Sequence, residues 1–225
     1  MSGERKEQEM DMYQCMWFCI AGSFLGYVIE MLWYRKLRGK WICRKGVIYG
    51  PYSPIYGIAL VGFSKTFYKI KDKIFIFIWG SILGSTFEYL CGFLQEKILG
   101  TKSWDYSKKP FQLHGRICLE FAVYWGMIAV FVVGWITPGL SRVYGLIPPE
   151  IREELIGILF GFFVFDCGIS GAACLQQRNR REGNIIKNRF TEFLDEHYPD
   201  ERLEKIFTEI RIIPSRPTKR ICGKI

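Results

Sequence analysis

Apolar residues in this chain gather in long blocks rather than in amphipathic periods. The blocks cover residues of about 12–34, 74–99, 116–136 and 155–175, and a shorter one covers about 54–68. About 20 consecutive apolar residues are needed to cross ~30 Å of hydrocarbon. The pattern therefore predicts an all-α integral membrane protein with about five transmembrane helices.

Polar segments divide the chain into three parts. Residues 1–11 form a polar N-terminus, 12–177 a transmembrane domain, and 178–225 a basic tail. Apolar residues at helical spacing predict two short amphipathic helices in the tail. The first apolar stripe is Ile186, Phe190, Phe193 and Leu194, and the second is Leu203, Ile206, Phe207 and Ile210.

The start of the short block is irregular in composition. Residues 46–57 read GVIYGPYSPIYG, with two prolines among the glycines, which argues against a regular helix. Non-helical backbone at membrane depth must be buried in protein or line a wet cavity. A re-entrant start and a simple interfacial loop both fit this segment.

Charge and cysteine content limit the partners. The formal net charge is +9, and in a chain with this many spans a basic balance favours anionic lipid headgroups over nucleic acid. The eight cysteines form no C-x-x-C pair, so we expect reduced, structural thiols. Placing the tail in the cytoplasm puts the more basic loops inside, which predicts N-out, C-in topology in the plasma (inner) membrane.

Two segments carry the same motif. Residues 22–30 and 80–88 both read G-S-x-L-G-x-x-x-E, and Gly46, Ile48 and Gly57 recur at the spacing of Gly115, Ile117 and Gly126. We therefore predict two repeated helical hairpins, at about 12–68 and 74–136, followed by a fifth helix at about 155–175.

The repeat predicts both a packing seam and a pair of carboxylates. Residues four apart share one helix face, so Gly22 and Gly26, like Gly80 and Gly84, form a glycine seam for a neighbouring helix. Glu30 and Glu88 follow at the ends of the two seams. We predict that these carboxylates are pseudo-equivalent and face inward.

Four further residues are candidates for a site. Arg116 begins an apolar block, and it can pair with Glu88 or Glu30, bind an anionic substrate, or serve as an interfacial anchor. Glu120 lies one turn later, so an intrahelical pair with Arg116 is favoured. Asp105 can cap a turn or join the site, and Tyr52 can be a belt residue or a ligand contact. Asp166, at the centre of its segment, needs a partner, water or a packing hydrogen bond.

Several motifs resemble one known family. The runs Gly50–Gly57 (GPYSPIYG), Trp104–Ser107 (WDYS) and Phe111–Cys118, with Trp125-Gly126, are similar to signatures of the bacterial family Putative ABC-transporter type IV. The resemblance covers roughly residues 18–135. It implies a multi-pass permease, and a separate ATPase subunit as its partner.

The leading interpretation is a small transporter or permease-like subunit in which Glu30, Glu88 and Arg116 form a polar centre, supported by Asp105 and Tyr52. The chain has no G-x-x-x-x-G-K-[ST] loop, so it is not itself the ATPase, and it has no G-x-S-x-G or H-E-x-x-H motif. We expect no metal, no cofactor, and a homo-oligomer. Two alternatives stay open: a membrane-embedded enzyme acting on lipid or lipid-linked head groups, and a membrane signalling or scaffold protein.

Overall fold

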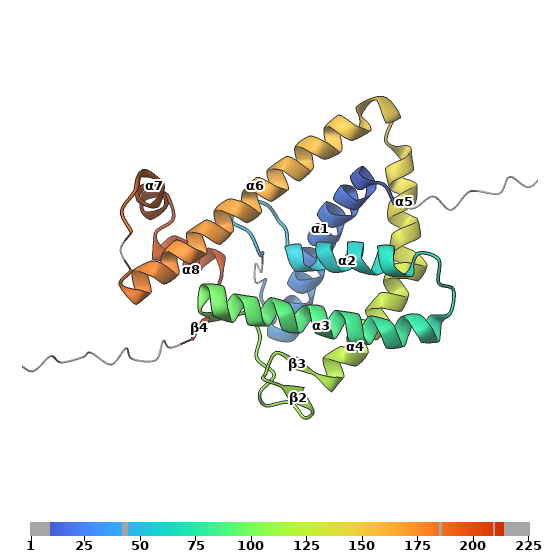
Figure 1. The fold of residues 1–225 in the computed structure, drawn as a ribbon, viewed down its shortest axis with the longest axis horizontal. Helices are drawn as coiled ribbons and strands as arrows, with labels where there is room; N and C mark the ends of the chain where they lie inside the picture. Colours follow the sequence, from blue (N-terminus) through green and yellow to red (C-terminus); the bar gives the residue numbers. More distant parts are fainter. Residues whose placement is uncertain (1–9, 42–44, 185, 209, 214–225) are drawn as a thin grey trace, which may run out of the picture.

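The computed structural model describes residues 10–41, 45–184, 186–208 and 210–213, and most of these are helical (Figure 1). The polar residues 1–9 and the end of the basic tail, 214–225, lie outside the described part. The helices are α1 (Met12–Arg38), α2 (Pro54–Phe67), α3 (Lys73–Leu99), α4 (Leu119–Phe131), the π-helix η1 (Val132–Ile136), α5 (Thr137–Leu146), α6 (Pro149–Glu182), α7 (Arg189–His197) and α8 (Asp200–Ile206). The two-residue strands are β1 (Thr101–Lys102), β2 (Gln112–Leu113), β3 (Ile117–Cys118) and β4 (Arg211–Ile212).

The predicted all-α membrane architecture is confirmed, with a refinement of the span count. Four helical stretches in the described residues are long and apolar enough to cross a membrane, namely α1, α3, the continuous α4–η1–α5 and α6. The remaining predicted span, α2, has only 14 residues. At 1.5 Å per residue it is about 21 Å long, shorter than the ~30 Å hydrocarbon layer.

The helix that begins at Leu119 does not end at Ile136 as predicted. It continues through η1 into α5 and reaches Leu146, with Pro138 in the first turn of α5. Proline lacks the N–H that would bond to the carbonyl four residues earlier. The π-turn widens the backbone ring just before it, and the Thr137 N–H donates to the Val132 carbonyl. The local widening lets the proline sit inside a continuous helix.

The contacts between α1 and α2 recur between α3 and α4. A Cβ on Gly57 of α2 would overlap the Ser23 hydroxyl of α1, and a Cβ on Gly126 of α4 would overlap the Ser81 hydroxyl of α3. Ser23 and Ser81 each donate to the carbonyl four residues earlier, at 2.7 and 2.9 Å. The repeat inferred from the sequence is thus also a repeat of helix–helix contacts.

The glycine seam packs against the companion helix of each hairpin. Gly22 and Gly26 face Leu60 and Tyr56 of α2, and Gly80 and Gly84 face Ala129 and Trp125 of α4. These small residues allow the close backbone approach that stabilises helix pairs where the surroundings are apolar.

Helix α6 runs diagonally along one side of the two hairpins, where it contacts α1, and its C-terminal end meets that of α3 (Figure 1). Arg178 donates to the carbonyls of Lys97 and Ile98 at 2.6 and 2.8 Å, and Arg181 donates to Leu99 at 3.2 Å. These carbonyls lack partners inside their own helix, so the two arginines cap the C-terminal end of α3. Their positive charges also interact favourably with the negative end of the helix dipole.

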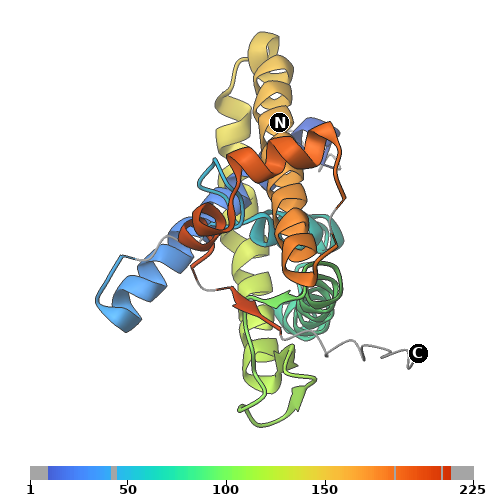
Figure 2. The same ribbon diagram turned by 90° about the vertical axis from the view of Figure 1, so that its left-hand side faces the viewer.

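The two tail helices predicted from their apolar spacing are present as α7 and α8, and they lie over the C-terminal half of α6 (Figure 2). Leu194 and Leu203 are buried in a cluster with Ile48 and Ala173. The first apolar stripe is not wholly buried, because the side chains of Ile186, Phe190 and Phe193 are exposed. The tail is also joined to the α3–α4 connection, where β4 pairs with β1 in antiparallel fashion.

The connections gather at two ends of the molecule. The tail contacts the segment after α1, the segment after α3 and the C-terminal half of α6. At the other end, the start of α1 meets the end of α5, where Gln14 donates to Ser141 at 3.1 Å and Trp17 donates to the Leu140 carbonyl at 3.3 Å. Helix α2 runs antiparallel to α1, since Tyr56 lies at Gly26 and Leu60 at Gly22. It therefore returns the chain toward this second end despite its short length.

Candidate functional site

Glu88 is a carboxylate buried at the end of the α3 seam. Its side chain is 6% exposed. It accepts hydrogen bonds from Trp125 Nε1 of α4 and from the Tyr106 hydroxyl of the α3–α4 connection, both at 2.9 Å. Both donors are neutral, so the charge of an ionised Glu88 is not balanced by an ion pair among the described residues.

Glu30 occupies the equivalent position in the first hairpin. It lies four residues after Gly26 on α1, and it accepts a hydrogen bond from the Tyr56 hydroxyl of α2 at 2.9 Å. Tyr56 and Trp125 are themselves equivalent, because each comes directly before the glycine, Gly57 or Gly126, that contacts the partner helix. Each hairpin thus presents a carboxylate to an aromatic donor on its second helix.

The two carboxylate clusters belong to hairpins that contact each other, since Phe63 of α2 packs against Trp125 of α4. Burial, followed by the Glu88 carboxylate, raises the pKa of Tyr106, and Tyr56 contributes to the same shift. We call Glu30, Tyr56, Tyr106 and Glu88 the polar centre. It lies where the two hairpins meet, next to the contact of Phe63 with Trp125, whose rings are 6.0 Å apart.

Arg116 does not pair with Glu88 or Glu30 as predicted. Its Nη2 atom lies 2.7 Å from a carboxylate oxygen of Glu96, two turns beyond Glu88 on α3, and its Nη1 donates to the Tyr89 hydroxyl at 3.0 Å. The bond to Glu96 is the main cause of the raised Arg116 pKa. The Arg116 carbonyl also accepts from Trp104 Nε1 at 2.9 Å, which holds the backbone at Arg116 beside Trp104.

The other charged residues of the α3–α4 connection have local partners. Asp105 accepts hydrogen bonds from the backbone N–H and the hydroxyl of Ser107, at 3.0 and 2.5 Å, and these bonds lower its pKa. This is the turn-capping arrangement. The predicted pair of Glu120 with Arg116 is wrong, because Glu120 pairs with Lys109 at 2.7 Å.

Asp166 bonds to backbone N–H groups. It is fully buried in α6 and accepts hydrogen bonds from the N–H groups of Tyr49 and Gly50, at 3.1 and 2.6 Å. Ser170, one turn later, accepts from the Ile48 N–H at 2.8 Å and donates to Asp166 at 3.2 Å. The segment of residues 46–53, which we call the buried loop, is thereby supplied with the partners that a helix would otherwise provide.

Tyr52 belongs to the buried loop and also contacts α6. Its ring meets Phe163 of α6 edge to face, with centroids 5.4 Å apart. In the same loop, the hydroxyl group of Tyr49 lies 2.5 Å from that of Tyr198 in the tail. The buried loop therefore connects α6 with the tail.

The predicted site residues thus form three clusters. Glu30 and Glu88 belong to the polar centre, Arg116 to an ion pair with Glu96, and Asp166 and Tyr52 to the buried loop. Among the described residues no three His, Cys, Asp or Glu side chains are placed to hold a metal ion. Sequence analysis missed Tyr56, Trp125 and Tyr106; the first two could have been found from their equivalent places beside the repeated glycines.

A model of the family described as Putative ABC-transporter type IV matches residues 16–171. This range contains both hairpins, the polar centre, and the part of α6 that holds Asp166 and Ser170, and it ends before the tail. No curated protein and no solved structure significantly matches the chain.

Proposed function

The chain belongs to the Putative ABC-transporter type IV family, and from this premise we propose that the polar centre is the substrate-binding or coupling site of a permease subunit. Family membership and four long apolar helices establish a transporter-like membrane protein. The proposal adds which residues bind the substrate or couple its transport.

The observation that supports it is the recurrence of the same arrangement in both hairpins, a carboxylate at the end of the glycine seam that accepts a hydrogen bond from an aromatic donor on the second helix. Ionisable residues inside a membrane are costly, and they commonly mark ion and substrate pathways. In transporters built from parallel repeats, the site lies where the repeats meet. Glu88 accepts from two uncharged donors, so its carboxylate retains acceptor capacity for a proton, a cation or a hydroxyl-bearing substrate.

The other two clusters support the site by positioning its surroundings. The Arg116–Glu96 pair ties the start of α4 to the end of α3, next to the connection that carries Tyr106. Asp166 holds the buried loop, which leads directly into α2 and so positions Tyr56. In this proposal Arg116 and Asp166 do not contact substrate.

We further propose that the tail and the connections after α1 and α3 face the cytoplasm and receive a separate ATPase subunit. The basic residues at this end, including Arg178, Arg180 and Arg181, agree with the positive-inside rule. Membership of an ABC-transporter family favours such a partner.

The test is purification of the chain from native membranes in mild detergent, with mass spectrometry of the proteins and lipids that accompany it. We expect an ATP-binding protein in stoichiometric amount. Recovery of the chain without one would overturn the permease-subunit proposal, and a tightly bound lipid in its place would favour the lipid-enzyme alternative.

The role of the polar centre is tested on the same complex in proteoliposomes. We expect Glu88→Gln and Glu30→Gln to retain the ATPase partner but to lower the rate of ATP hydrolysis. Glu153→Gln, at an exposed position near the start of α6, is the matched control. Equal rates in all three variants would remove the polar centre from the mechanism.

A further inference from the structure

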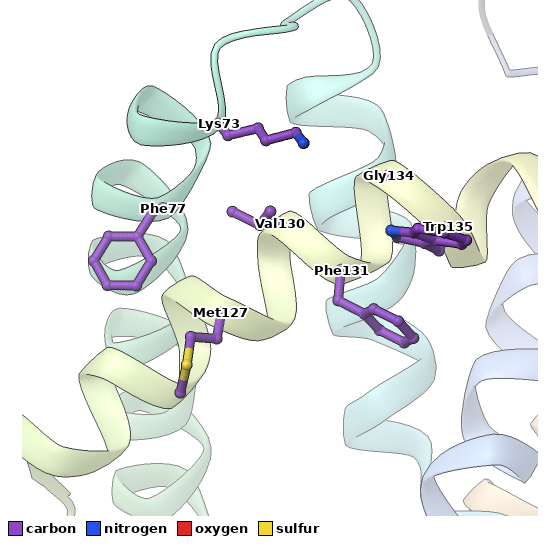
Figure 3. Close-up of a pocket in the computed structure, with 7 residues that line it drawn as sticks. All are labelled: Lys73, Phe77, Met127, Val130, Phe131, Gly134 and Trp135. Atoms are coloured by element: carbon purple, nitrogen blue, oxygen red, sulfur yellow. The ribbon is translucent and has the colours of Figure 1, made fainter.

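An open groove lies where α3 and α4 separate. The two helices are in close contact at Gly80 with Ala129 and at Gly84 with Trp125. Toward the start of α3 the contact opens into a pocket of about 570 Å³, within the size range of ligand sites. We call it the lipid groove (Figure 3), and its lining residues are Lys73, Phe77, Met127, Val130, Phe131, Gly134 and Trp135.

The groove is apolar along its length and open on one side. Gly134 lies in the π-turn, and a Cβ built on it would meet no atom within 4 Å. Trp135, the next residue, is 74% exposed, and Phe131 is 55% exposed. These residues belong to a helix long and apolar enough to cross a membrane, where exposed apolar side chains meet hydrocarbon.

A single charged group stands at the mouth of the groove. Lys73 begins α3, and its side chain extends toward the helix that carries Val130 and Gly134 (Figure 3). Within the described residues Lys73 forms no ion pair. The neighbouring Asp72 is directed to the helix end, where it accepts from the N–H groups of Ile74 and Phe75 at 2.9 and 3.2 Å.

We propose that the lipid groove binds one anionic phospholipid, with an acyl chain along its apolar walls and the phosphate on the Lys73 ammonium. A lysine at the start of a membrane helix reaches toward the headgroup layer, where anionic phosphate supplies the missing countercharge. An apolar helix from a partner protein would fill the walls but leave the ammonium uncompensated. Lys69 and Lys71, just before the helix, add to the positive potential at the same place.

The experiment uses the full chain in nanodiscs with equal amounts of phosphatidylglycerol and phosphatidylcholine that carry the same acyl chains. Native mass spectrometry then measures which lipid remains bound after release. We expect retained phosphatidylglycerol in the wild type. Lys73→Gln should weaken its retention about fivefold, the factor that corresponds to one juxtamembrane lysine, and Gly134→Leu should abolish the retention of both lipids by filling the groove.

Two controls separate this result from general effects. Gly161→Leu also adds a side chain where a Cβ meets no atom within 4 Å, but it lies on α6 away from the groove. Lys205→Gln removes an exposed charge from the tail. Both should retain phosphatidylglycerol as the wild type does.

Three results would overturn the proposal. These are equal retention in Lys73→Gln and the wild type, equal retention of the two lipids in the wild type, or loss of a dimer rather than of lipid in Gly134→Leu, which would assign the groove to a second copy. The lysine variant changes a surface side chain, so it keeps the test decisive even if the leucine variant folds poorly. The outcome does not depend on the polar centre or on an ATPase partner.

Discussion

Removing the Asp166 carboxylate should destabilise the protein through the buried loop rather than through α6 itself. In Asp166→Ala the N–H groups of Tyr49 and Gly50 lose their acceptor. The Gly50 N–H is in a buried residue and the Tyr49 N–H is part-buried, so water replaces the carboxylate poorly. Ser170 keeps its bond to the Ile48 N–H, but its hydroxyl loses the Asp166 carboxylate as acceptor.

The magnitude follows from the number of groups left without a partner. A buried N–H without an acceptor costs about 1–3 kcal/mol, and the part-buried Tyr49 N–H costs less than a buried one, so the two together cost about 2–4 kcal/mol. Against a typical free energy of unfolding of about 5–15 kcal/mol, this is a large loss. Asp166→Asn keeps one acceptor oxygen but presents an amide N–H₂ to the second group, so we expect about half the effect.

The assay is equilibrium unfolding in one detergent, followed by tryptophan fluorescence, together with amide hydrogen exchange of the buried loop. The expected order of stability is wild type, Asp166→Asn, Asp166→Ala, with faster exchange confined first to residues 46–53. Glu153→Ala, at an exposed position on the same helix, is the control and should lie within about 0.5 kcal/mol of the wild type. If Asp166→Ala is as stable as this control, and its loop exchanges as slowly as in the wild type, the holding role of Asp166 is refuted.

Three further outcomes are expected. Gly57→Ala should lower the unfolding free energy by about 1–3 kcal/mol, because its Cβ would overlap the backbone of α1, whereas Gly62→Ala, which has open space, should not, as measured by the same unfolding assay. Trp125→Phe should lower the unfolding free energy by about 1–3 kcal/mol, because it removes the indole N–H that donates a hydrogen bond to Glu88. An unchanged unfolding midpoint would contradict this. The lowered pKa of Asp105 means that its stabilisation is present above the ordinary value of 3.8 and is lost as pH falls through the lower folded value, so Asp105→Asn should flatten the acid limb of stability against pH.

The polar centre shows how far a repeat can be followed in sequence. Glu30 and Glu88 were predicted because identical spacing places each at the end of a glycine seam. The partner of Arg116 could not be predicted in this way. Glu88 and Glu96 lie on one face of α3, two helical turns apart, so periodicity cannot choose between them. The choice depends on where the α3–α4 connection returns, which the Trp104 bond to the Arg116 carbonyl helps to determine.

By itself, the sequence determined the properties that depend on neighbouring positions along one helix. These are the long apolar stretches, the glycine seam, the paired carboxylates and the two amphipathic helices of the tail, all of which follow from residue spacing at the helical period. Only the tertiary structure decided which groups meet across long separations. Tyr49 and Asp166 are 117 residues apart, and their hydrogen bond exists because α6 runs along the hairpins beside a loop whose N–H groups have no helical partner. A buried N–H group requires an acceptor, but the sequence around it does not say which distant residue will supply one.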